Sequence, residues 1–198
     1  LIEMFLAESF LRDRTTKDPN ARTKIFSETT TKYCRRATSI LDVEIQTEGY
    51  DPTFFEKENC LLVSNHLSYL DILVMSSLRP FVYVSSVDMS EVFLLGRIIT
   101  YGGTIFVERR NRVKVDQDLG NMTKALKDGF NVMLFPEGTS TNGSDVLPFK
   151  KSLLMAAVHA GKRIVPVSMK YVEIDGEPFS EKNRDFVCWY GDMGFGSH

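Results

Sequence analysis

The sequence has few cysteines, few histidines and no long apolar run, and each shortage narrows the possible functions. The three cysteines, Cys34, Cys60 and Cys188, are widely separated, so the sequence predicts no disulfide framework and favours a reducing compartment. The three histidines show no metal-ligand spacing, and we therefore expect no metal site. No apolar run reaches the roughly 18 residues that a membrane-spanning helix needs.

The charge balance also excludes a class of partner. Lysine and arginine number 24, and aspartate and glutamate number 26, which gives a formal net charge of −2. Nucleic-acid-binding proteins usually carry a broad basic excess, so we expect no nucleic-acid partner. A length of 198 residues, of which 43% are hydrophobic and 25% charged, is typical of one globular domain with a helical appendage.

The first 41 residues have a helical pattern. Residues 1–11 and 21–41 both space their apolar side chains as amphipathic helices do, and the segment is slightly basic. Helices of this kind can lie on a membrane surface. A helical hairpin packed against the rest of the protein explains the pattern equally well. We therefore divide the chain into an N-terminal helical segment, 1–41, and a second domain, 42–198.

From residue 42 onward the pattern alternates between short apolar strands and amphipathic helices. The predicted strands are residues 42–48, 60–64, 81–86, 104–107, 131–135, 164–171 and 186–190. The predicted helices are residues 68–78, 89–101, 112–127 and 151–160. This alternation is typical of an α/β fold, so we predict a mixed, largely parallel sheet flanked by helices. Pro166 implies that its strand lies at an edge or contains a bulge.

The stretch from Cys60 to Asp71 carries the strongest chemical signal. An apolar strand ends at Ser64, His66 follows it, and Ser68 opens a helix. Ligands bind at this end of the strands in open α/β sheets. Asp71 lies in the first helical turn, from which it can reach back and orient the imidazole of His66 as a general base. Ser68 and Asp71 also fit a helix capping box, which is the structural alternative.

Further groups that suit a phosphate or a polar ligand follow other strands. Arg109 comes directly after a predicted strand, and arginine pairs its planar donors with phosphate oxygens; a solvated charged turn is the alternative. Another strand leads into Pro-Glu-Gly-Thr, where Glu137 offers hydrogen-bond acceptors and Gly138 lets a ligand approach the backbone. Lys150 precedes a helix start, where anions bind, although two solvated lysines explain Lys150 and Lys151 equally well.

Four short blocks occur in order along the chain. They are Asn65-His66-x-x-x-x-Asp71, Gly103-x-x-Phe106-x-x-Arg109, Phe135-Pro-Glu-Gly-Thr139 and Val165-Pro-Val167. Together they resemble the blocks of the glycerolipid acyltransferase family, of the 1-acyl-glycerol-3-phosphate acyltransferase type. The resemblance covers roughly residues 40–172, so the segment from Trp189 to Asp192 lies outside it and has no predicted role.

The resemblance implies a role for each matched residue. His66 would be the general base, Asp71 its orienting partner, and Arg109 the ligand of the acceptor's phosphate. The other implied or candidate substrate contacts are Glu137, Gly138, Thr139 and Lys150. The implied reaction moves a fatty acyl group to the hydroxyl of a lysophospholipid, with lysophosphatidic acid as the expected acceptor. Acyl-coenzyme A or acyl-carrier protein would be the co-substrate, and no other cofactor is implied.

Other functions fit the same residues. The acceptor could be glycerol-3-phosphate or a lyso-aminolipid, and loss of Arg109 should matter less where the acceptor has no phosphate. A hydrolase of thioesters or lipids would use His66 to activate water, whereas an idle lipid-binding protein would not need both His66 and Asp71. Lipid substrates imply a membrane-associated protein, and a reducing compartment implies the cytoplasmic face of that membrane.

Overall fold

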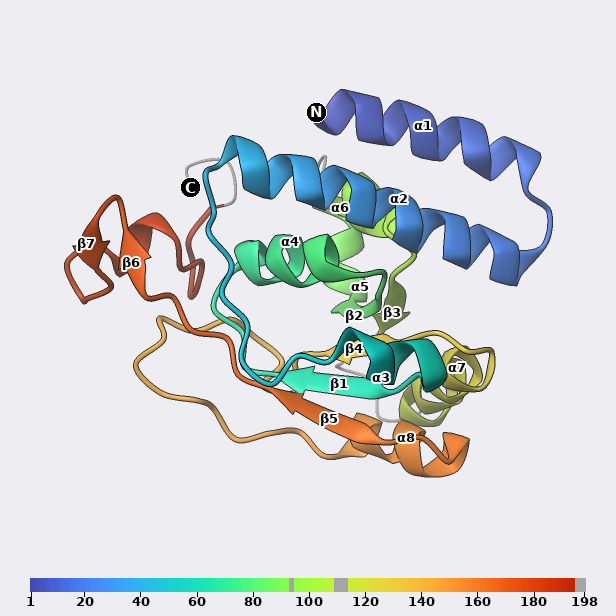
Figure 1. The fold of residues 1–198 in the computed structure, drawn as a ribbon. Coiled ribbons are helices and arrows are strands. Elements are labelled where there is room, and N and C mark those ends of the chain that lie inside the picture. The colour runs from blue at the N-terminus through green and yellow to red at the C-terminus, as the bar shows by residue number, and fades with distance from the viewer. Residues whose placement is uncertain (93–94, 109–113, 195–198) are drawn as a thin grey trace.

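The computed structural model contains a five-stranded parallel sheet with helices on both faces (Figure 1). It describes residues 1–92, 95–108 and 114–194. The strands are β1 (Leu61–Ser64), β2 (Val82–Ser86), β3 (Ile105–Val107), β4 (Val132–Leu134) and β5 (Ile164–Val167). Their order is β3-β2-β4-β1-β5, and every neighbouring pair is parallel. The predicted α/β class is therefore confirmed, and the carboxyl ends of all five strands meet at one edge.

The helices form layers above and below this sheet. They are α1 (Ile2–Thr15), α2 (Pro19–Ile40), α3 (Pro52–Lys57), α4 (Tyr69–Leu78), α5 (Val87–Ser90), α6 (Leu95–Tyr101), α7 (Val115–Lys127) and α8 (Met155–Ala160), with short 3-10 helices η2 (Ser152–Leu154) and η3 (Arg184–Phe186). Helix α4 covers one face, with α2 over α4 and α1 over α2 (Figure 1). Helices α7 and α8 cover the other face.

The core consists of two apolar layers, one on each face of the sheet. Leu61 and Val63 of β1 pack toward α7, where Met122 is fully buried. Leu62, between them in the strand, packs on the opposite face with Met75 of α4. Successive side chains of a strand point to opposite faces, so a strand that is covered on both sides reads as a continuous apolar run. This double cover makes β1 a rigid support for the loop that follows it.

Helices α1 and α2 form a hairpin that packs on the rest of the protein through α4 and α6. The hydroxyl of Tyr33 on α2 donates to the carboxylate of Glu8 on α1 at 2.9 Å. Arg35 on α2 donates from Nε to the carbonyl oxygen of Ser77 in α4 at 2.7 Å. The helices predicted within residues 1–41 are confirmed, and the hairpin arrangement is the one that the structure shows. Among the helices in the described parts of the chain, none has the length and apolar character to cross a membrane.

Two predicted strands are wrong. Residues 42–48 form no strand, because this surface segment has no neighbouring strand to bond, and its alternating pattern alone cannot create one. Residues 186–190 begin with the last residue of the 3-10 helix η3, and the amide of Cys188 donates to the carbonyl of Arg184 at 2.8 Å. That hydrogen bond closes a turn, so these residues do not form the extended strand that the sequence predicts.

The sequence analysis did not predict helix α3 or a small β-hairpin, although each has a recognisable local signal. Helix α3 begins after Asp51, whose side chain accepts a hydrogen bond from a backbone amide and caps the helix. A small antiparallel hairpin joins β6 (Glu173–Ile174) to β7 (Glu177–Pro178). Asp175 and Gly176 both have positive φ at its turn, which is the behaviour of an Asp-Gly hairpin turn.

Some predicted elements differ from the structure mainly in extent. The helix predicted over residues 89–101 corresponds to α5 and α6, and residues 93–94 between them lie outside the described residues. The strand predicted over residues 164–171 ends at Val167. Pro166 pairs with Val63 in this strand, β5, which is an edge strand of the sheet, as the proline implied.

Candidate active site

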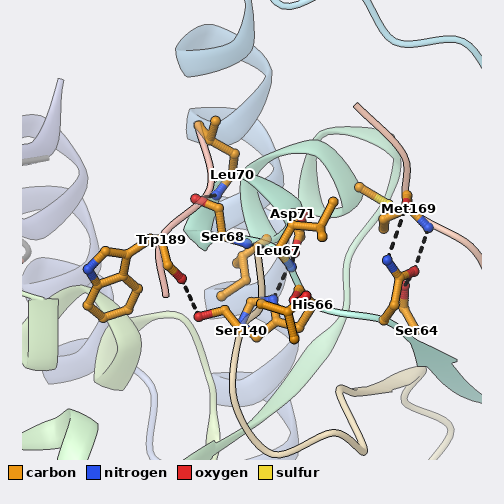
Figure 2. Close-up of polar contacts among 12 residues, drawn as sticks. Ser64, His66, Leu67, Ser68, Leu70, Asp71, Ser140, Met169 and Trp189 are labelled. Atoms are coloured by element: carbon orange, nitrogen blue, oxygen red, sulfur yellow. Dashed lines mark hydrogen bonds and ion pairs between the residues drawn. The ribbon is translucent and has the colours of Figure 1, made fainter. Parts of the chain in front are cut away.

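His66 lies in the loop between β1 and α4, at the carboxyl edge of the sheet (Figure 2). Its Nδ1 is 2.8 Å from Oδ2 of Asp71. The Asp71 side chain is fully buried, whereas 18% of the His66 side chain is exposed. A carboxylate oxygen accepts hydrogen bonds, so this contact places the ring proton on Nδ1 and leaves Nε2 as the basic nitrogen. No group in the described part of the chain bonds Nε2.

Asp71 accepts hydrogen bonds from four donors. Its Oδ2 bonds Nδ1 of His66, the amide of Leu67 at 2.6 Å and the amide of Ser68 at 3.1 Å. Its Oδ1 accepts from the hydroxyl of Tyr171 at 2.7 Å. Ser68 and Asp71 also form the capping box at the start of α4. The capping interpretation and the predicted contact with the imidazole are therefore both present, and they share one carboxylate.

The ring of Phe135 lies against the imidazole of His66. The two ring centroids are 4.0 Å apart and the ring planes differ by 14°, which is a stacked arrangement. The carbonyl of His66 accepts a hydrogen bond from the amide of Thr141 at 2.9 Å. Residues from the loop after β4 thus restrain both the ring and the backbone of His66. Sequence reasoning missed this stack, although Phe135 belongs to one of the four blocks.

Glu137 is buried between the His66 loop and the loop after β4. It is 3% exposed, and its Oε1 accepts from the amide of His66 at 2.7 Å. Its Oε2 accepts from the amide of Leu147, also at 2.7 Å. Each carboxylate oxygen of Glu137 thus accepts a backbone hydrogen bond, and the predicted contact of Glu137 with the acceptor stays a prediction. The residue ties two loops together beside the candidate base.

The turn after β4 brings three of the predicted substrate contacts to the carboxyl edge. Gly138 has a φ of +79°, and a Cβ atom built there would lie 2.5 Å from Nζ of Lys150. The ammonium group of Lys150 therefore lies directly against this turn. Thr139 and Lys150 are both exposed. A cationic group at this position suits an anionic ligand, and the predicted phosphate contact of Lys150 stays a prediction.

Arg109 lies outside the described residues, so its predicted phosphate contact stays a prediction. The strand before it, β3, ends at Val107 on the same edge of the sheet as β1. The amide of Glu108 donates to Oδ2 of the buried Asp118 on α7 at 3.0 Å. The chain is thus anchored as far as the last described residue before Arg109.

The segment around Trp189, for which the sequence predicts no role, packs against the His66 loop. The amide of Trp189 donates to the carbonyl of Leu67 at 3.0 Å. The hydroxyl of Ser140 donates to the carbonyl oxygen of Trp189 (Figure 2). Both acceptors are backbone carbonyls, which every residue type carries, so no sequence signal could have found these contacts.

The cysteines do not suit nucleophilic catalysis. Burial raises the pKa of Cys188 to about 11, and the negative charge of Asp71 adds to the effect. Burial likewise raises the pKa of Cys34 and of Cys60 to about 11. These thiols are protonated near neutral pH, and the thiolate is the reactive form. Within the described ranges, no group of three or more His, Cys, Asp or Glu side chains could hold a metal ion.

The fold and the site define a class of protein, namely α/β domains that hold a carboxylate-oriented histidine at the carboxyl edge of a parallel sheet. A family model described as Acyltransferase matches residues 42–170. This match spans more than half of the chain, and the chain belongs to the acyltransferase family. The resemblance carried by the four sequence blocks is thereby confirmed.

Individual relatives show the same relation. The chain is 33% identical over 145 residues to the lyso-ornithine lipid O-acyltransferase of Rhizobium meliloti, across 70% of this chain and 50% of that protein. It is 30% identical over 142 residues to the 1-acyl-sn-glycerol-3-phosphate acyltransferase of Neisseria gonorrhoeae, across 71% of this chain and 54% of that protein. The crystal structure of the 1-acyl-sn-glycerophosphate acyltransferase PlsC from Thermotoga maritima matches with a TM-score of 0.58 and 26% identity, across 83% of this chain and 64% of that one. The chain spans about half the length of these two curated relatives.

Proposed function

We propose that the protein transfers a fatty acyl group from an acyl thioester to the free hydroxyl of a lysolipid. The observation that carries the proposal is the 2.8 Å contact between Nδ1 of His66 and the buried Asp71, at the edge of the sheet where ligands bind. Membership of the acyltransferase family supports the acyl chemistry. The proposed donor is acyl-coenzyme A or acyl-carrier protein, used as a co-substrate.

His66 is the proposed general base. Its Nε2 takes the proton of the acceptor hydroxyl while the hydroxyl oxygen attacks the carbonyl carbon of the thioester. The tetrahedral oxyanion then collapses, the carbon–sulfur bond breaks, and the leaving thiolate takes the proton from the imidazolium. The products are an ester and a free thiol, and His66 returns to its neutral form. Asp71 keeps the other ring proton on Nδ1 and stabilises the imidazolium, and general-base catalysis of this kind is worth about 10²- to 10⁴-fold in rate.

The proposed acceptor is lysophosphatidic acid. Lys150 lies at the turn formed by Gly138, which supports a phosphate contact there, and Arg109, which follows β3 in the sequence, is the second proposed phosphate ligand. A lyso-ornithine lipid is the second candidate, because the relative from Rhizobium meliloti bears that name. Replacing Arg109 or Lys150 with alanine should weaken the use of a phosphate acceptor more than the use of an acceptor with an amino-acid headgroup.

We also propose that α1 contacts a membrane surface, at its cytoplasmic face. Met4 and Leu11 are 56% and 64% exposed, and they lie seven residues apart on one side of the helix. Exposed apolar side chains on an amphipathic helix bind the lipid–water interface. A Met4→Gln, Leu11→Gln variant should sediment less with phospholipid vesicles and keep its turnover of detergent-dispersed substrate. Unchanged sedimentation would contradict this contact.

Product analysis tests the proposed function. Purified protein is given labelled acyl-coenzyme A with lysophosphatidic acid, with lyso-ornithine lipid, with glycerol-3-phosphate, or with no acceptor. Transfer predicts a labelled acylated lipid with a lysolipid acceptor and little free fatty acid without one. Release of labelled fatty acid at one rate, whatever acceptor is present, would contradict transfer and identify a hydrolase.

A further inference from the structure

Tyr171 donates to Asp71 from a segment that is far from it in the chain. Its hydroxyl bonds Oδ1 at 2.7 Å, whereas Oδ2 accepts the three hydrogen bonds from the His66 loop. Residue 171 lies one position beyond the region that the family model matches. From this geometry we infer that Tyr171 is a positioning residue, which acts on His66 through Asp71 and tunes the basicity of the ring.

The two oxygens of Asp71 are bonded by two different segments of the chain. A carboxylate that is bonded through one oxygen only can turn about its Cβ–Cγ bond, because that torsion is broad. With Tyr171 on Oδ1, the carboxylate plane is set and Oδ2 stays aimed at Nδ1 of His66. Without Tyr171, a buried carboxylate oxygen would lose its hydrogen-bond partner.

The backbone that carries Tyr171 is itself tied to the His66 loop. The side chain of Asn65 accepts from the amide of Met169 at 2.8 Å and donates to the carbonyl of Met169 at 3.0 Å. The ring of Tyr171 packs edge-on against Phe179, with centroids 6.0 Å apart. Asn65 immediately precedes His66, so one short stretch of chain holds both the candidate base and the segment that bears Tyr171.

Tyr171 remains a hydrogen-bond donor over the working pH range. Burial, followed by the charge of Asp71 and the hydrogen bond to it, raises the pKa of Tyr171 well above its usual range. Burial is also the main cause of the raised pKa of Tyr83 on β2 and of Cys188. The negative charge of Asp71 adds to the rise in the pKa of both groups. These three groups therefore stay neutral while a histidine titrates.

Two further charged groups near the His66 loop belong to the loop after β4. Glu137 accepts from the backbone amide of His66, and Lys150 lies against the turn at Gly138. A change at Tyr171 alters neither of them, because its hydroxyl bonds Asp71. A shift in the titration of His66 on changing Tyr171 would therefore report the contact through Asp71.

The direction of the expected effect follows from the hydrogen bond. Donation from Tyr171 spreads the negative charge of Asp71, so removing the hydroxyl leaves a more basic carboxylate beside Nδ1 of His66. A more basic partner favours the imidazolium, and the pKa of the His66 ring should rise. The rate effect rests on the proposed general-base function, whereas the effect on the ring titration does not.

The test is the titration of the His66 ring by NMR in Tyr171→Phe and in the unchanged protein. We expect its pKa to rise by about 0.5 to 1 unit in the variant. The acid limb of the acyl-transfer rate should move by the same amount, with kcat at pH 7 about twofold to threefold lower and KM nearly unchanged. Tyr33→Phe is the matched control, because it also removes a tyrosine–carboxylate hydrogen bond, from Glu8 on α1, and it should leave the His66 titration unchanged.

A second variant should shift the pKa of the His66 ring in the opposite direction. Site-specific 3-fluorotyrosine at position 171 is a stronger donor, and it should lower the pKa of His66. An unchanged ring titration in a Tyr171→Phe protein that is folded by circular dichroism would overturn the inference. A shifted ring titration with an unshifted rate profile would support the contact through Asp71 and contradict the proposed role of His66 as the base, so the two failures can be told apart.

Discussion

The two edges of the sheet hold their charged groups in different ways. At the amino edge, an open groove of about 620 Å³ lies between the start of α2, the end of α4 and the loop before β4, and Lys24, Glu28 and Arg79 contribute charge to its lining. At the carboxyl edge, Asp71 and Glu137 are buried, and backbone amides bond both carboxylates.

The volume of the groove at the amino edge therefore does not by itself identify that groove as the functional site. The guanidinium of Arg79 rests 4.3 Å from the centroid of the Phe55 ring, so the charged group of Arg79 packs against an aromatic side chain. Buried carboxylates are costly unless donors surround them, and the carboxyl edge supplies those donors from several loops. These donors support the proposal that the chemistry takes place at the carboxyl edge.

A carboxylate-to-amide exchange at each edge should give the largest contrast. Asp71→Asn places an N–H group among donors and removes the orienting charge, so turnover should fall by about 10³-fold or more. The free energy of unfolding should also fall by about 2 kcal/mol. Glu28→Gln at the amino edge is the matched control and should change neither quantity much. Equal rates for both variants, measured by acyl transfer, would leave Asp71 with the capping role alone.

Glu137→Gln should have an intermediate effect. One of the two amides that bond Glu137 would then face an N–H group, which loosens the tie between His66 and the loop at Leu147. We expect turnover to fall by about tenfold and the free energy of unfolding by about 1–3 kcal/mol. Steady-state kinetics and urea unfolding of the same preparation measure both. A loss confined to KM for the acceptor would instead support the contact predicted from the sequence.

Loss of a stacked ring should have a smaller effect. Phe135→Leu keeps an apolar side chain and removes the ring that stacks on His66, and aromatic pairs are worth about 0.5–1.5 kcal/mol. Turnover should fall by about threefold to tenfold. Phe54→Leu removes a ring pair with Phe55 near the amino edge, where the ring centroids are 5.0 Å apart, and should leave turnover unchanged. A comparable loss of rate in both variants would show a general loss of packing.

The smallest expected effect lies in the α1–α2 hairpin. The hydrogen bond from Lys32 is the main cause that lowers the pKa of Glu8 to about 2 from its ordinary 4.5. Because the folded pKa is the lower one, Glu8 stabilises the fold above about pH 4.5, and this contribution disappears as the pH falls toward 2. The group is partly solvated, so we expect less than about 1 kcal/mol.

Unfolding of Glu8→Gln and of the unchanged protein at several pH values measures this contribution of Glu8 to the free energy of unfolding. The difference in unfolding free energy should be present at pH 7 and absent near pH 2, while the acyl-transfer rate of the two proteins at pH 7 stays equal. A difference that persists at pH 2 would show that charge is not its source.

Local sequence signals were enough for the central part of the fold and the site. The apolar run before Ser64 and the cap at Ser68 predicted β1, α4 and the loop between them. They also placed His66 and Asp71 within reach of each other, and the structure shows that contact. Such features could be predicted because each depends on side chains only a few positions apart.

The rest depended on contacts between distant segments. Tyr171 reaches Asp71 across 100 residues, and Phe135 stacks on His66 only because β4 pairs with β1. The amides that bond Glu137 come from two loops whose approach no local pattern encodes, so the sequence could not predict these hydrogen bonds. The wrong strand at residues 42–48 has the same cause, since a strand needs a neighbour and the pattern does not supply one.

The most direct measurement is the initial rate of acyl transfer by His66→Ala, in protein whose folding is checked by circular dichroism. The account predicts a rate at least about 10²-fold below that of the unchanged protein with every lysolipid acceptor, because no other group is proposed to take the hydroxyl proton. A rate close to that of the unchanged protein would contradict the account.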